Sequence, residues 1–360
     1  MSNAILTRAI DALASRRDLS AEETAEVLNE IMHGETSETQ IAAFLIALRT
    51  KGETVDELAG LARTMRELAA HVPISREDLL DTAGTGGGRR TFNVSTTAAL
   101  IAAGAGCAVA KHGNRSATSS SGSADLLEAL GARIDLAPDG VARCIDEAGF
   151  GFMFAPAHHQ ATRYVVPVRR ELAVRTIFNF LGPLTNPAGA RRQVIGVSDP
   201  ALLETIAGAL ARLGVDRALV VSSEDGLDEL SIAAATKVVE VNGDRLERYT
   251  LAPGDVGIEQ SSPEVLERDC AGGTPEQNAA TARAILGYGA DAEPGQSAPV
   301  AAVELATINA GAAIYVAGAV ASIAEGVEAA RAALADGAAA EALARYVRAS
   351  HANASSGVTP

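Results

Sequence analysis

Short apolar runs alternate with helical segments beyond Pro73, and this alternation limits the folds open to the chain more than any other feature. The helical segments include Ala124–Leu130 and Leu202–Leu213. Strands that alternate with helices form a mostly parallel sheet joined by right-handed crossovers. The sequence therefore predicts an α/β domain with a mostly parallel central sheet, whose strands we place at Leu79–Ala83, Cys107–Ala110, Phe150–Ala155, Val194–Val197 and Ala218–Val221.

The residues before Pro73 predict helices alone. Ser37 and Gln40 form a capping box, and Thr54 with Glu57 repeats that signature before a second amphipathic helix. Because proline cannot continue a helix, the second helix should end before Pro73. We expect a small all-helical domain over residues 1–72. Its clearest helix has apolar residues at positions i, i+3, i+4 and i+7, which are Ile41, Phe44, Leu45 and Leu48.

Two later patterns complete the expected α/β domain, which we place at residues 73–350. Thr236–Val241 and Arg245–Leu251 flank Asn242-Gly243, a two-residue hairpin signal. Thr274-Pro275 opens another helix, with threonine as its cap and proline at its first position. We expect residues 351–360 to form a flexible tail.

Charge and cysteine content exclude several classes of protein. The chain has 45 acidic and 30 basic residues, for a net charge of −15. Nucleic acid and anionic membranes both attract a net basic face, so neither is an expected partner. The cysteines, Cys107, Cys144 and Cys270, lie far apart without metal-ligand spacing, which favours reduced core residues and a cytoplasmic protein. The apolar window Ala298–Ala321 contains Glu304 and predicts a buried helix.

The stretch AGTGGGRRTFNVSTT, residues 83–97, lies between a predicted strand and a predicted helix. Successive glycines let several main-chain N–H groups converge on one anion, and a helix N-terminus adds partial positive charge. The stretch is neither a GxGxxG nor a Walker pattern, because no Lys-Ser/Thr pair closes it. The alternative is an ordinary glycine turn with Asn93 or Ser95 as the helix cap.

A second polar loop follows the next predicted strand, in AKHGNRSATSSSGSADLLEALG. Lys111 ends that strand, and Asn114 and Arg115 lie in the loop. Because the ends of parallel strands meet at one edge of a sheet, this loop should stand beside the glycine-rich stretch. Taken one at a time, these residues have alternatives without a binding role. Lys111 would be a surface lysine, His112 a loop histidine and the serines a solvated turn.

Two further segments carry charge. Asp228 and Glu229 lie in SSEDGLDELS, directly after a predicted strand, and adjacent carboxylates suit Mg²⁺. In VRRELAVRTIFNFLGPLTNP, Arg169 and Arg170 lie on an apparent helix before a stiff turn that contains Pro183. Such an arginine can hold a carboxylate while a flat ring packs on the proline. A solvated acidic loop and a snorkelling surface arginine are the alternatives.

Together these four stretches resemble the anthranilate phosphoribosyltransferases, and the similarity extends over most of the chain. The resemblance implies a nucleoside-phosphorylase-like phosphoribosyltransferase fold, in which a segment near residues 163–187 returns to the helical domain. It also implies a homodimer formed through the helical parts and an active site between the domains. The implied reaction, in tryptophan biosynthesis, converts 5-phosphoribosyl 1-diphosphate (phosphoribosyl diphosphate below) and anthranilate into N-(5-phosphoribosyl)anthranilate and diphosphate.

The resemblance assigns roles to matching positions. Phosphoribosyl diphosphate would be bound by Gly84, Thr85, Gly86, Gly87, Thr91, Asn93, Ser95, Thr96, Lys111 and Ser119. Anthranilate would be bound by Gly84, His112, Asn114, His159, Arg169 and Pro183, with Arg169 nearest its carboxylate. Mg²⁺, as two ions bound with the diphosphate, would be held by Ser95, Asp228 and Glu229. No covalent nucleophile or obligatory base is expected, because neutralising the leaving diphosphate and positioning the amine suffice.

The chain departs from the family pattern in two places. Gly88, Arg89 and Arg90 replace a longer segment in which the family has Asp after GTGG, and this change bears on metal handling and on the conformation of the loop. We hypothesise that the two arginines supply extra phosphate contacts. Farther along, Thr162 replaces the usual aromatic residue and Tyr164 the usual histidine, which would alter the packing around an aromatic substrate.

Two alternative functions are compatible with the same fold. A pyrimidine nucleoside phosphorylase would differ in the lysine-containing loop, and GPLTNP favours the anthranilate enzyme. A non-catalytic relative that binds nucleic acid should carry a basic surface, which the acidic composition disfavours.

Overall fold

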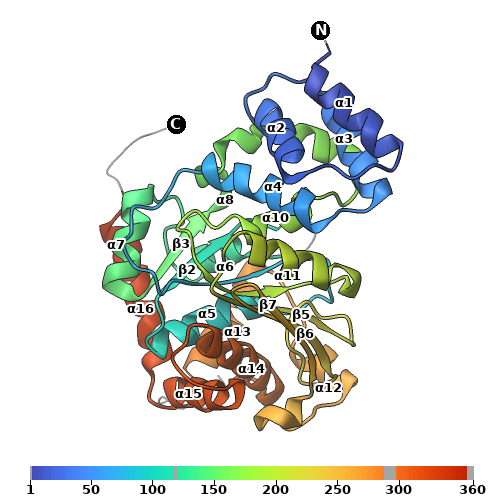
Figure 1. Ribbon diagram of the computed structural model, residues 1–360. Helices are drawn as coiled ribbons and strands as arrows, with labels where there is room; N and C mark the ends of the chain where they lie inside the picture. The colour runs from blue at the N-terminus through green and yellow to red at the C-terminus, as the bar shows by residue number, and fades with distance from the viewer. Residues whose placement is uncertain (1, 117–119, 288–296, 355–360) are drawn as a thin grey trace.

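A seven-stranded sheet lies at the centre of the molecule in the computed structural model, which describes residues 2–116, 120–287 and 297–354 (Figure 1). The strand order is β3-β2-β1-β4-β5-β6-β7. The first five strands of this order are parallel, and β6 and β7 add to β5 as an antiparallel hairpin. The predicted α/β class with a mostly parallel sheet is confirmed. The strands are β1 Leu80–Gly84, β2 Val109–Gly113, β3 Phe150–Phe154, β4 Arg192–Gly196, β5 Arg217–Ser223, β6 Thr236–Asn242 and β7 Arg245–Leu251.

The strand order changes direction between β1 and β4. From β1 the chain adds β2 and β3 on one side, and it then returns to place β4 and β5 on the other side. The carboxyl ends of the central strands are aligned, with Gly84 opposite Gly196 and Gly196 opposite Val221. In open α/β sheets, ligands bind outside the carboxyl ends of the strands at such a reversal. This part of the sheet edge is therefore the first place to look for a site.

The hairpin of β6 and β7 forms as predicted, but its turn lies one residue later. Asn242 pairs with Arg245 at the end of the ladder, so Gly243 and Asp244 make the two-residue loop. Gly243 has a φ of 57°, which glycine adopts without steric cost.

The described part of the chain contains sixteen α-helices. The N-terminal group is α1 Ala4–Ala14, α2 Ala21–Met32, α3 Glu38–Lys51 and α4 Val55–Glu67. The segment between β3 and β4 forms α8 Ala155–His158, η1 Gln160–Tyr164, α9 Val166–Leu172 and α10 Phe178–Leu184. The remaining elements are α5 Val94–Gly104, α6 Ser123–Ala129, α7 Pro138–Ala148, η2 Pro200–Leu202, α11 Leu203–Arg212, η3 Pro253–Val256, α12 Pro263–Asp269, α13 Pro275–Leu286, α14 Val300–Val316, α15 Ile323–Ala335 and α16 Ala338–Ala352.

Two apolar cores form on the two faces of the sheet. Side chains alternate between faces along a strand, so Val194 and Leu219 enter one core while Ile195 and Val220 enter the other. The first core lies against α5, α14 and α16, and the second lies against α11, α9, α10 and the N-terminal helices (Figure 1). The N-terminal helices thus share a core with the sheet.

The segment between β3 and β4 is joined to the N-terminal helices by backbone contacts. The N–H of Ala70 donates to the carbonyl of His158, and the N–H of Val72 donates to that of Pro187. Arg66 Nε donates to the Leu184 carbonyl at 2.7 Å. Helices α3 and α9 are also in contact. These contacts place the end of α4 and the residues that follow it beside this segment.

Of the two predicted capping boxes, that of α4 forms completely and that of α3 forms only in part. Thr54 and Glu57 form the full reciprocal capping box of α4. At α3, Ser37 accepts the Gln40 N–H, but the Gln40 side chain instead exchanges two hydrogen bonds with the backbone of Asn3. The predicted capping box is therefore only half formed, because the glutamine ties the start of α3 to the start of α1.

Helix α14 is the buried helix predicted from the window Ala298–Ala321. Apart from Glu304 and Tyr315, which are partly exposed, and Val300 at its start, its side chains are buried, and it packs against α5 and α15. Over the described ranges, no helix combines the length and the apolar character needed to cross a bilayer.

The chain remains part of the folded body beyond residue 350, where we expected a tail. Helix α16 continues to Ala352, and the Asn353 side chain is buried. Its Oδ1 accepts a hydrogen bond from Arg143, and its Nδ2 donates to Glu147 at 3.1 Å. These contacts stabilise the end of α16 against α7, so the expected boundary was wrong for residues 351–354. Residues 355–360 lie outside the described part of the chain.

The contact between α14 and α15 requires glycine. An ideal Cβ at Gly326 would lie 2.1 Å from the carbonyl oxygen of Gly311. We expect Gly326→Ala to lower the free energy of unfolding by about 1–3 kcal/mol, because the backbones must move apart. Urea denaturation measures this change. Gly254→Ala is the control, since no atom lies within 4 Å of an added Cβ at that exposed glycine. Equal unfolding midpoints for the two variants would contradict the prediction.

Candidate functional site

Three loops meet at the carboxyl edge of the sheet beside the reversal between β1 and β4. The glycine loop, residues 85–92, follows β1, and the acidic loop, residues 224–230, follows β5. The loop from residue 114 follows β2. The glycine loop and the acidic loop, which are the two parts of the predicted diphosphate site, therefore follow the two strands that flank β4.

The glycine loop is in direct contact with the acidic loop. The Gly86 N–H donates to Asp228 Oδ2 at 3.1 Å. A Cβ at Gly84 would lie 2.9 Å from that oxygen, and a Cβ at Gly88 would lie 2.6 Å from Oδ1 of the same carboxylate. Gly86 and Gly87 have φ values of 64° and 89°, which glycine adopts without steric cost. Glycine is needed here for close approach and for its backbone conformation.

A small cavity lies directly beneath this contact. Its volume is about 20 Å³, and its lining includes Ser95, Asp228 and Glu229, the three predicted metal ligands. Glu229 Oε2 is buried and has no hydrogen-bond partner among the described residues. Burial raises the pKa of Glu229 well above its usual range, and the neighbouring Asp228 and Asp225 carboxylates raise it further. Burial also raises the pKa of Asp228, which the Gly86 N–H and Arg175 oppose.

The residues of this cavity fit Mg²⁺. Two carboxylates and a hydroxyl are hard oxygen ligands, and Mg²⁺ usually completes its shell with waters and substrate phosphates. The described residues contain no group of three or more His, Cys, Asp or Glu that could hold a metal ion by themselves. A partial protein shell of this kind suits an ion that arrives with a phosphorylated substrate.

Lys111 lies inside the molecule, at the floor of the site. Its ammonium donates to the Thr82 carbonyl and lies 3.4 Å from Ser95 Oγ. Burial lowers the pKa of Lys111 to about 8, and the nearby Asp81 carboxylate opposes that shift. Asp81 is fully buried and accepts hydrogen bonds from the His112 N–H and from Asn186. The alternative of a surface lysine is wrong.

Asn93 opens α5 without capping it. Its side chain makes no cap hydrogen bond, which removes the alternative of an ordinary asparagine cap. Instead, Oδ1 accepts from Ser121 Oγ at 3.0 Å and from Asn278 Nδ2 at 2.8 Å, and Nδ2 donates to the Ser121 carbonyl. One N–H of the Asn93 amide therefore has no partner among the described residues and can serve a ligand. Nearby, Thr96 Oγ1 is buried without a hydrogen-bond partner among the described residues.

The aromatic side of the site is built from two histidines and the proline turn. The rings of His112 and His159 lie 5.0 Å apart. His112 Nδ1 bonds the Gly182 carbonyl and His159 Nε2 the Thr185 carbonyl, so each of these nitrogens carries the proton. His112 Nε2 is then an acceptor, and it is buried without a partner among the described residues. Burial lowers the pKa of both rings, that of His159 to about 4, so both are neutral.

The remaining predicted residues occupy different settings. Arg169 is partly buried with its guanidinium over the Phe178 ring, while Arg170 is exposed on the same helix. Pro183 is buried in α10. Asn114 is exposed, and its Oδ1 accepts the Arg115 N–H. Thr91 forms an isolated bridge with Ala271. Ser119 lies outside the described residues.

The residues that depart from the family pattern mostly serve the fold in this structure. The Arg89 N–H donates to the Gly226 carbonyl, and its side chain lies 3.8 Å from Glu267. Thr162 donates to the carbonyl of His159. The Tyr164 ring lies next to Gly34, where it would meet an added Cβ. The expected change in packing around an aromatic substrate at this position stays a prediction.

Three residues at the site had no role in the sequence interpretation. Arg175 donates to the carbonyls of Thr85 and Gly86, Asn278 holds Asn93, and Asp81 lies beside Lys111. No local pattern marks an arginine or an amide whose partners lie far along the chain. The only signal was the position of Arg175 within the segment that also contains Arg169 and Pro183.

Comparison with known proteins gives a consistent result. A family described as "Glycosyl transferase family, a/b domain" matches residues 76–340, and one described as "Glycosyl transferase family, helical bundle domain" matches residues 7–69. The anthranilate phosphoribosyltransferase of Saccharophagus degradans is 50% identical over 343 residues, which are 94% of this chain and 97% of the relative. The enzyme of Rubrobacter xylanophilus is 50% identical over 347 residues, covering 96% and 98%.

Solved structures agree with these relatives. The anthranilate phosphoribosyltransferase of Thermus thermophilus matches with a TM-score of 0.86 and 46% identity, over 95% of this chain and 99% of that one. The enzyme of Saccharomyces cerevisiae, in complex with PRPP and Mg, matches with a TM-score of 0.85 and 26% identity, over 98% and 99%.

The burial of neutral His159 predicts that the stability of the protein depends on pH. Unfolded histidine has a pKa of about 6.5, whereas burial lowers that of folded His159 to about 4. The unfolded chain therefore binds more protons between these values, and stability falls as the pH drops. Between about pH 7 and pH 5, we expect the protein to lose about 1–2 kcal/mol more stability than His159→Gln, which keeps a donor for Thr185. Urea denaturation at both pH values measures the difference, and parallel losses would contradict it.

Proposed function

Since the chain belongs to the anthranilate phosphoribosyltransferase family, we propose that the cavity at the carboxyl ends of β1, β4 and β5 carries the family's reaction. In that reaction the phosphoribosyl group of phosphoribosyl diphosphate is transferred to the amine of anthranilate in tryptophan biosynthesis. The observation that carries the proposal is the contact between Gly86 and Asp228 above a cavity lined by Ser95 and Glu229. This contact places a main-chain N–H group, which can bind an anion, beside a carboxylate, which can bind a cation.

The glycine loop and the residues around it bind phosphoribosyl diphosphate. Residues Gly84–Gly87 and the hydroxyls of Thr91, Ser95 and Thr96 contact the diphosphate and the ribose. The remaining N–H of Asn93 is a further donor, and Lys111 supplies a point charge below Ser95. Ser119 contributes to the same side. The unpartnered Thr96 hydroxyl supports this assignment, because a buried polar group without a partner is costly.

Ser95, Asp228 and Glu229 hold Mg²⁺, and two ions bind together with the diphosphate. The ions supply positive charge that neutralises the leaving diphosphate. Burial raises the pKa of each carboxylate, and a bound cation would favour the charged forms. The yeast relative solved with PRPP and Mg supports the same cofactor.

Anthranilate binds on the histidine side. Arg169, partly buried over Phe178, pairs with its carboxylate, while Pro183 and the rings of His112 and His159 pack around its ring. The unpartnered Nε2 of His112 is an acceptor suited to an N–H of the arylamine. Gly84 and Asn114 complete this side. The yeast relative has been solved with 4-fluoroanthranilate.

The reaction at this site needs positioning and charge stabilisation rather than a covalent nucleophile. The C1–O bond of the ribose breaks as charge develops on the diphosphate, where the N–H groups of the glycine loop and the Lys111 ammonium stabilise it. The neutral arylamine then attacks C1 from the histidine side, and it loses one N–H proton as the C–N bond forms. Because burial keeps both histidines neutral, they orient the amine without carrying a charge into the site.

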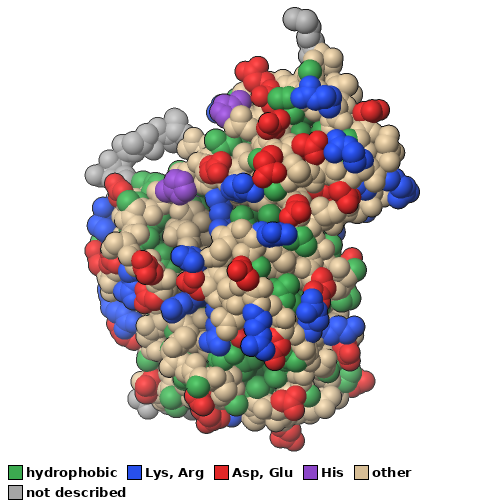
Figure 2. Space-filling model, viewed as in Figure 1, with side chains coloured by type: hydrophobic (Ala, Val, Ile, Leu, Met, Phe, Trp, Pro, Cys, Tyr) green, Lys and Arg blue, Asp and Glu red, His purple; other side chains and the backbone are tan. Residues whose placement is uncertain are grey.

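The alternative functions are not favoured. The most similar relatives described above are anthranilate phosphoribosyltransferases at about half identity, which favours neither a nucleoside phosphorylase nor a nucleic-acid-binding protein. Figure 2 shows acidic and basic side chains interspersed over the visible face, without a basic patch across it. The buried free thiols Cys107, Cys144 and Cys270 suit the reducing cytoplasm, where we place the enzyme.

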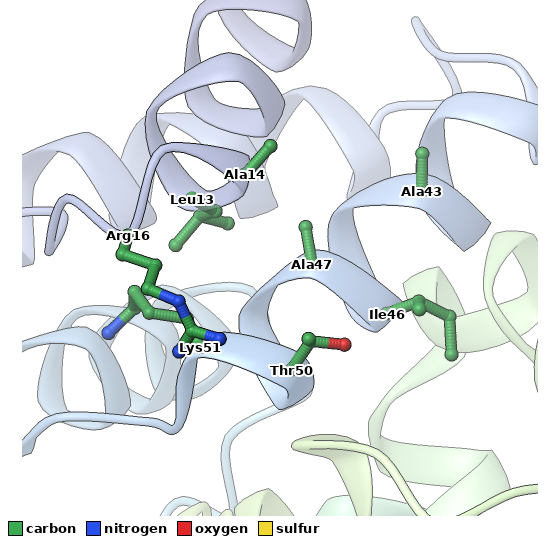
Figure 3. A pocket seen from close by; sticks show the side chains of 8 residues that line it. All are labelled: Leu13, Ala14, Arg16, Ala43, Ile46, Ala47, Thr50 and Lys51. Carbon is green, nitrogen blue, oxygen red and sulfur yellow. The ribbon is translucent and has the colours of Figure 1, made fainter.

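The enzyme forms a homodimer through its helical unit. Helices α1 and α3 line an open cavity of about 310 Å³ that includes Leu13, Ile46 and Ala47 (Figure 3). Ile46 is 37% exposed, and Val166 on the adjoining α9 is 41% exposed. Neighbouring exposed apolar side chains of this kind mark an interaction surface, and a second copy of the chain covers it by two-fold symmetry.

The metal site generates the first functional prediction. We expect Asp228→Asn and Glu229→Gln each to reduce kcat/KM by at least about 100-fold, because each removes a charge that holds the ion against the diphosphate. The loss of anthranilate fluorescence, with Mg²⁺ and phosphoribosyl diphosphate present, measures the rate. Glu224→Gln is the control, since this exposed residue of the same loop should leave the rate unchanged. An inactive wild-type protein would overturn the proposed function.

The helical surface generates a second prediction. We expect Ile46→Asp to convert the protein from a dimer to a monomer of 36.7 kDa, because a carboxylate buried against the partner would be desolvated. Light scattering coupled to size-exclusion chromatography measures the mass. Val300→Asp, at a position that is 67% exposed on α14, should leave the dimer intact. A monomeric wild-type protein would contradict the assignment.

A further inference from the structure

Arg175 holds the glycine loop by its carbonyl groups. Its Nη1 donates to the Gly86 carbonyl at 2.7 Å, and its Nη2 donates to the Thr85 carbonyl at 3.1 Å. Ser198, which follows β4, adds a second donor to the Gly86 carbonyl at 2.9 Å and lies 3.2 Å from Nη1. The planar fork of an arginine can meet two neighbouring acceptors in a fixed geometry.

The direction of these carbonyls determines the direction of the N–H groups in the loop. In a trans peptide the C=O and the following N–H point in opposite directions. With the Thr85 and Gly86 carbonyls directed at Arg175, the N–H groups of Gly86 and Gly87 are directed away from it. The Gly86 N–H does point to Asp228 on that opposite side. Glycine has little intrinsic preference between these orientations, so an external contact must select one.

The position of Arg175 is itself constrained by the fold. Ala173 ends α9 with a φ of 53°, unusual for a residue with a side chain, and turns the chain before Arg175. The guanidinium lies over the Phe180 ring, 5.6 Å from its centre. An ideal Cβ at Gly87 would lie 1.8 Å from Nη1, so the loop leaves space for the arginine.

We propose that Arg175, assisted by Ser198, is a positioning residue that turns the Gly86 and Gly87 N–H groups toward the diphosphate site. This inference rests on the proposed function for its ligand. Arg175 lies between Arg169 and Pro183 in the segment assigned to anthranilate. It thereby connects the segment on the anthranilate side with the loop that binds the diphosphate.

Hydrogen exchange of the ligand-free protein tests the positioning directly. We expect amides in peptides from residues 84–92 to exchange about tenfold faster in Arg175→Ala, because the N–H groups are no longer held toward Asp228. Peptides from α14 should be unchanged. Arg170→Ala is the matched control, since this exposed arginine lies on the same segment. Unchanged exchange in the glycine loop would overturn the proposal.

Calorimetric titration with phosphoribosyl diphosphate and Mg²⁺ tests the consequence. We expect Arg175→Ala and Arg175→Lys each to raise the dissociation constant about tenfold or more, with a smaller rise for Ser198→Ala and an unchanged melting temperature. If Arg175→Ala retains wild-type affinity for phosphoribosyl diphosphate, the proposal is wrong. If the wild-type protein binds no phosphoribosyl diphosphate, the proposed function fails, while the exchange experiment still decides the role of Arg175 in the loop.

Discussion

The contact between the Gly86 N–H and the Asp228 carboxylate is the constraint on which the rest of the site depends. It requires two loops from strands on either side of β4 to approach within hydrogen-bond distance. Side chains would prevent that approach, because a Cβ at Gly84, Gly88 or Gly196 would overlap atoms of Asp228. An amide that can bind an anion and a carboxylate that can bind a cation are thereby placed side by side. A diphosphate with its metal ion presents both charges and suits this pairing.

The strand order and the two cores create the surroundings of that contact. Because the order reverses between β1 and β4, the loops after β1, β2 and β5 gather at one part of the sheet edge. The N-terminal helices share a core with one face of the sheet, and the segment from α8 to α10 connects the two. That segment brings Arg175 to the glycine loop and Gly182, next to Pro183, to His112. The loops of the site are therefore held between packed elements.

Much of the fold could be predicted because its signals are local. Apolar runs identified the five parallel strands within a few residues, and Thr54 with Glu57 marked the start of α4. The errors arose where a distant partner intervened. Gln40 bonds Asn3 instead of completing its capping box, and the ladder between β6 and β7 moves the hairpin turn by one residue. Contacts of Asn353 with α7 similarly keep the end of α16 folded.

The sequence by itself determined the fold class and the chemistry of the site. The glycines, Lys111, Asp228 and Glu229 were recognisable because their residue types and their positions after predicted strands imply anion and metal binding. Tertiary structure decided which polar atoms the protein uses internally and which remain for a ligand. Asn93 is left with one N–H because Ser121 and Asn278 occupy the rest of its amide. Such partners lie far apart in the chain, so hydrogen-bonding capacity is settled only when folding brings the segments together.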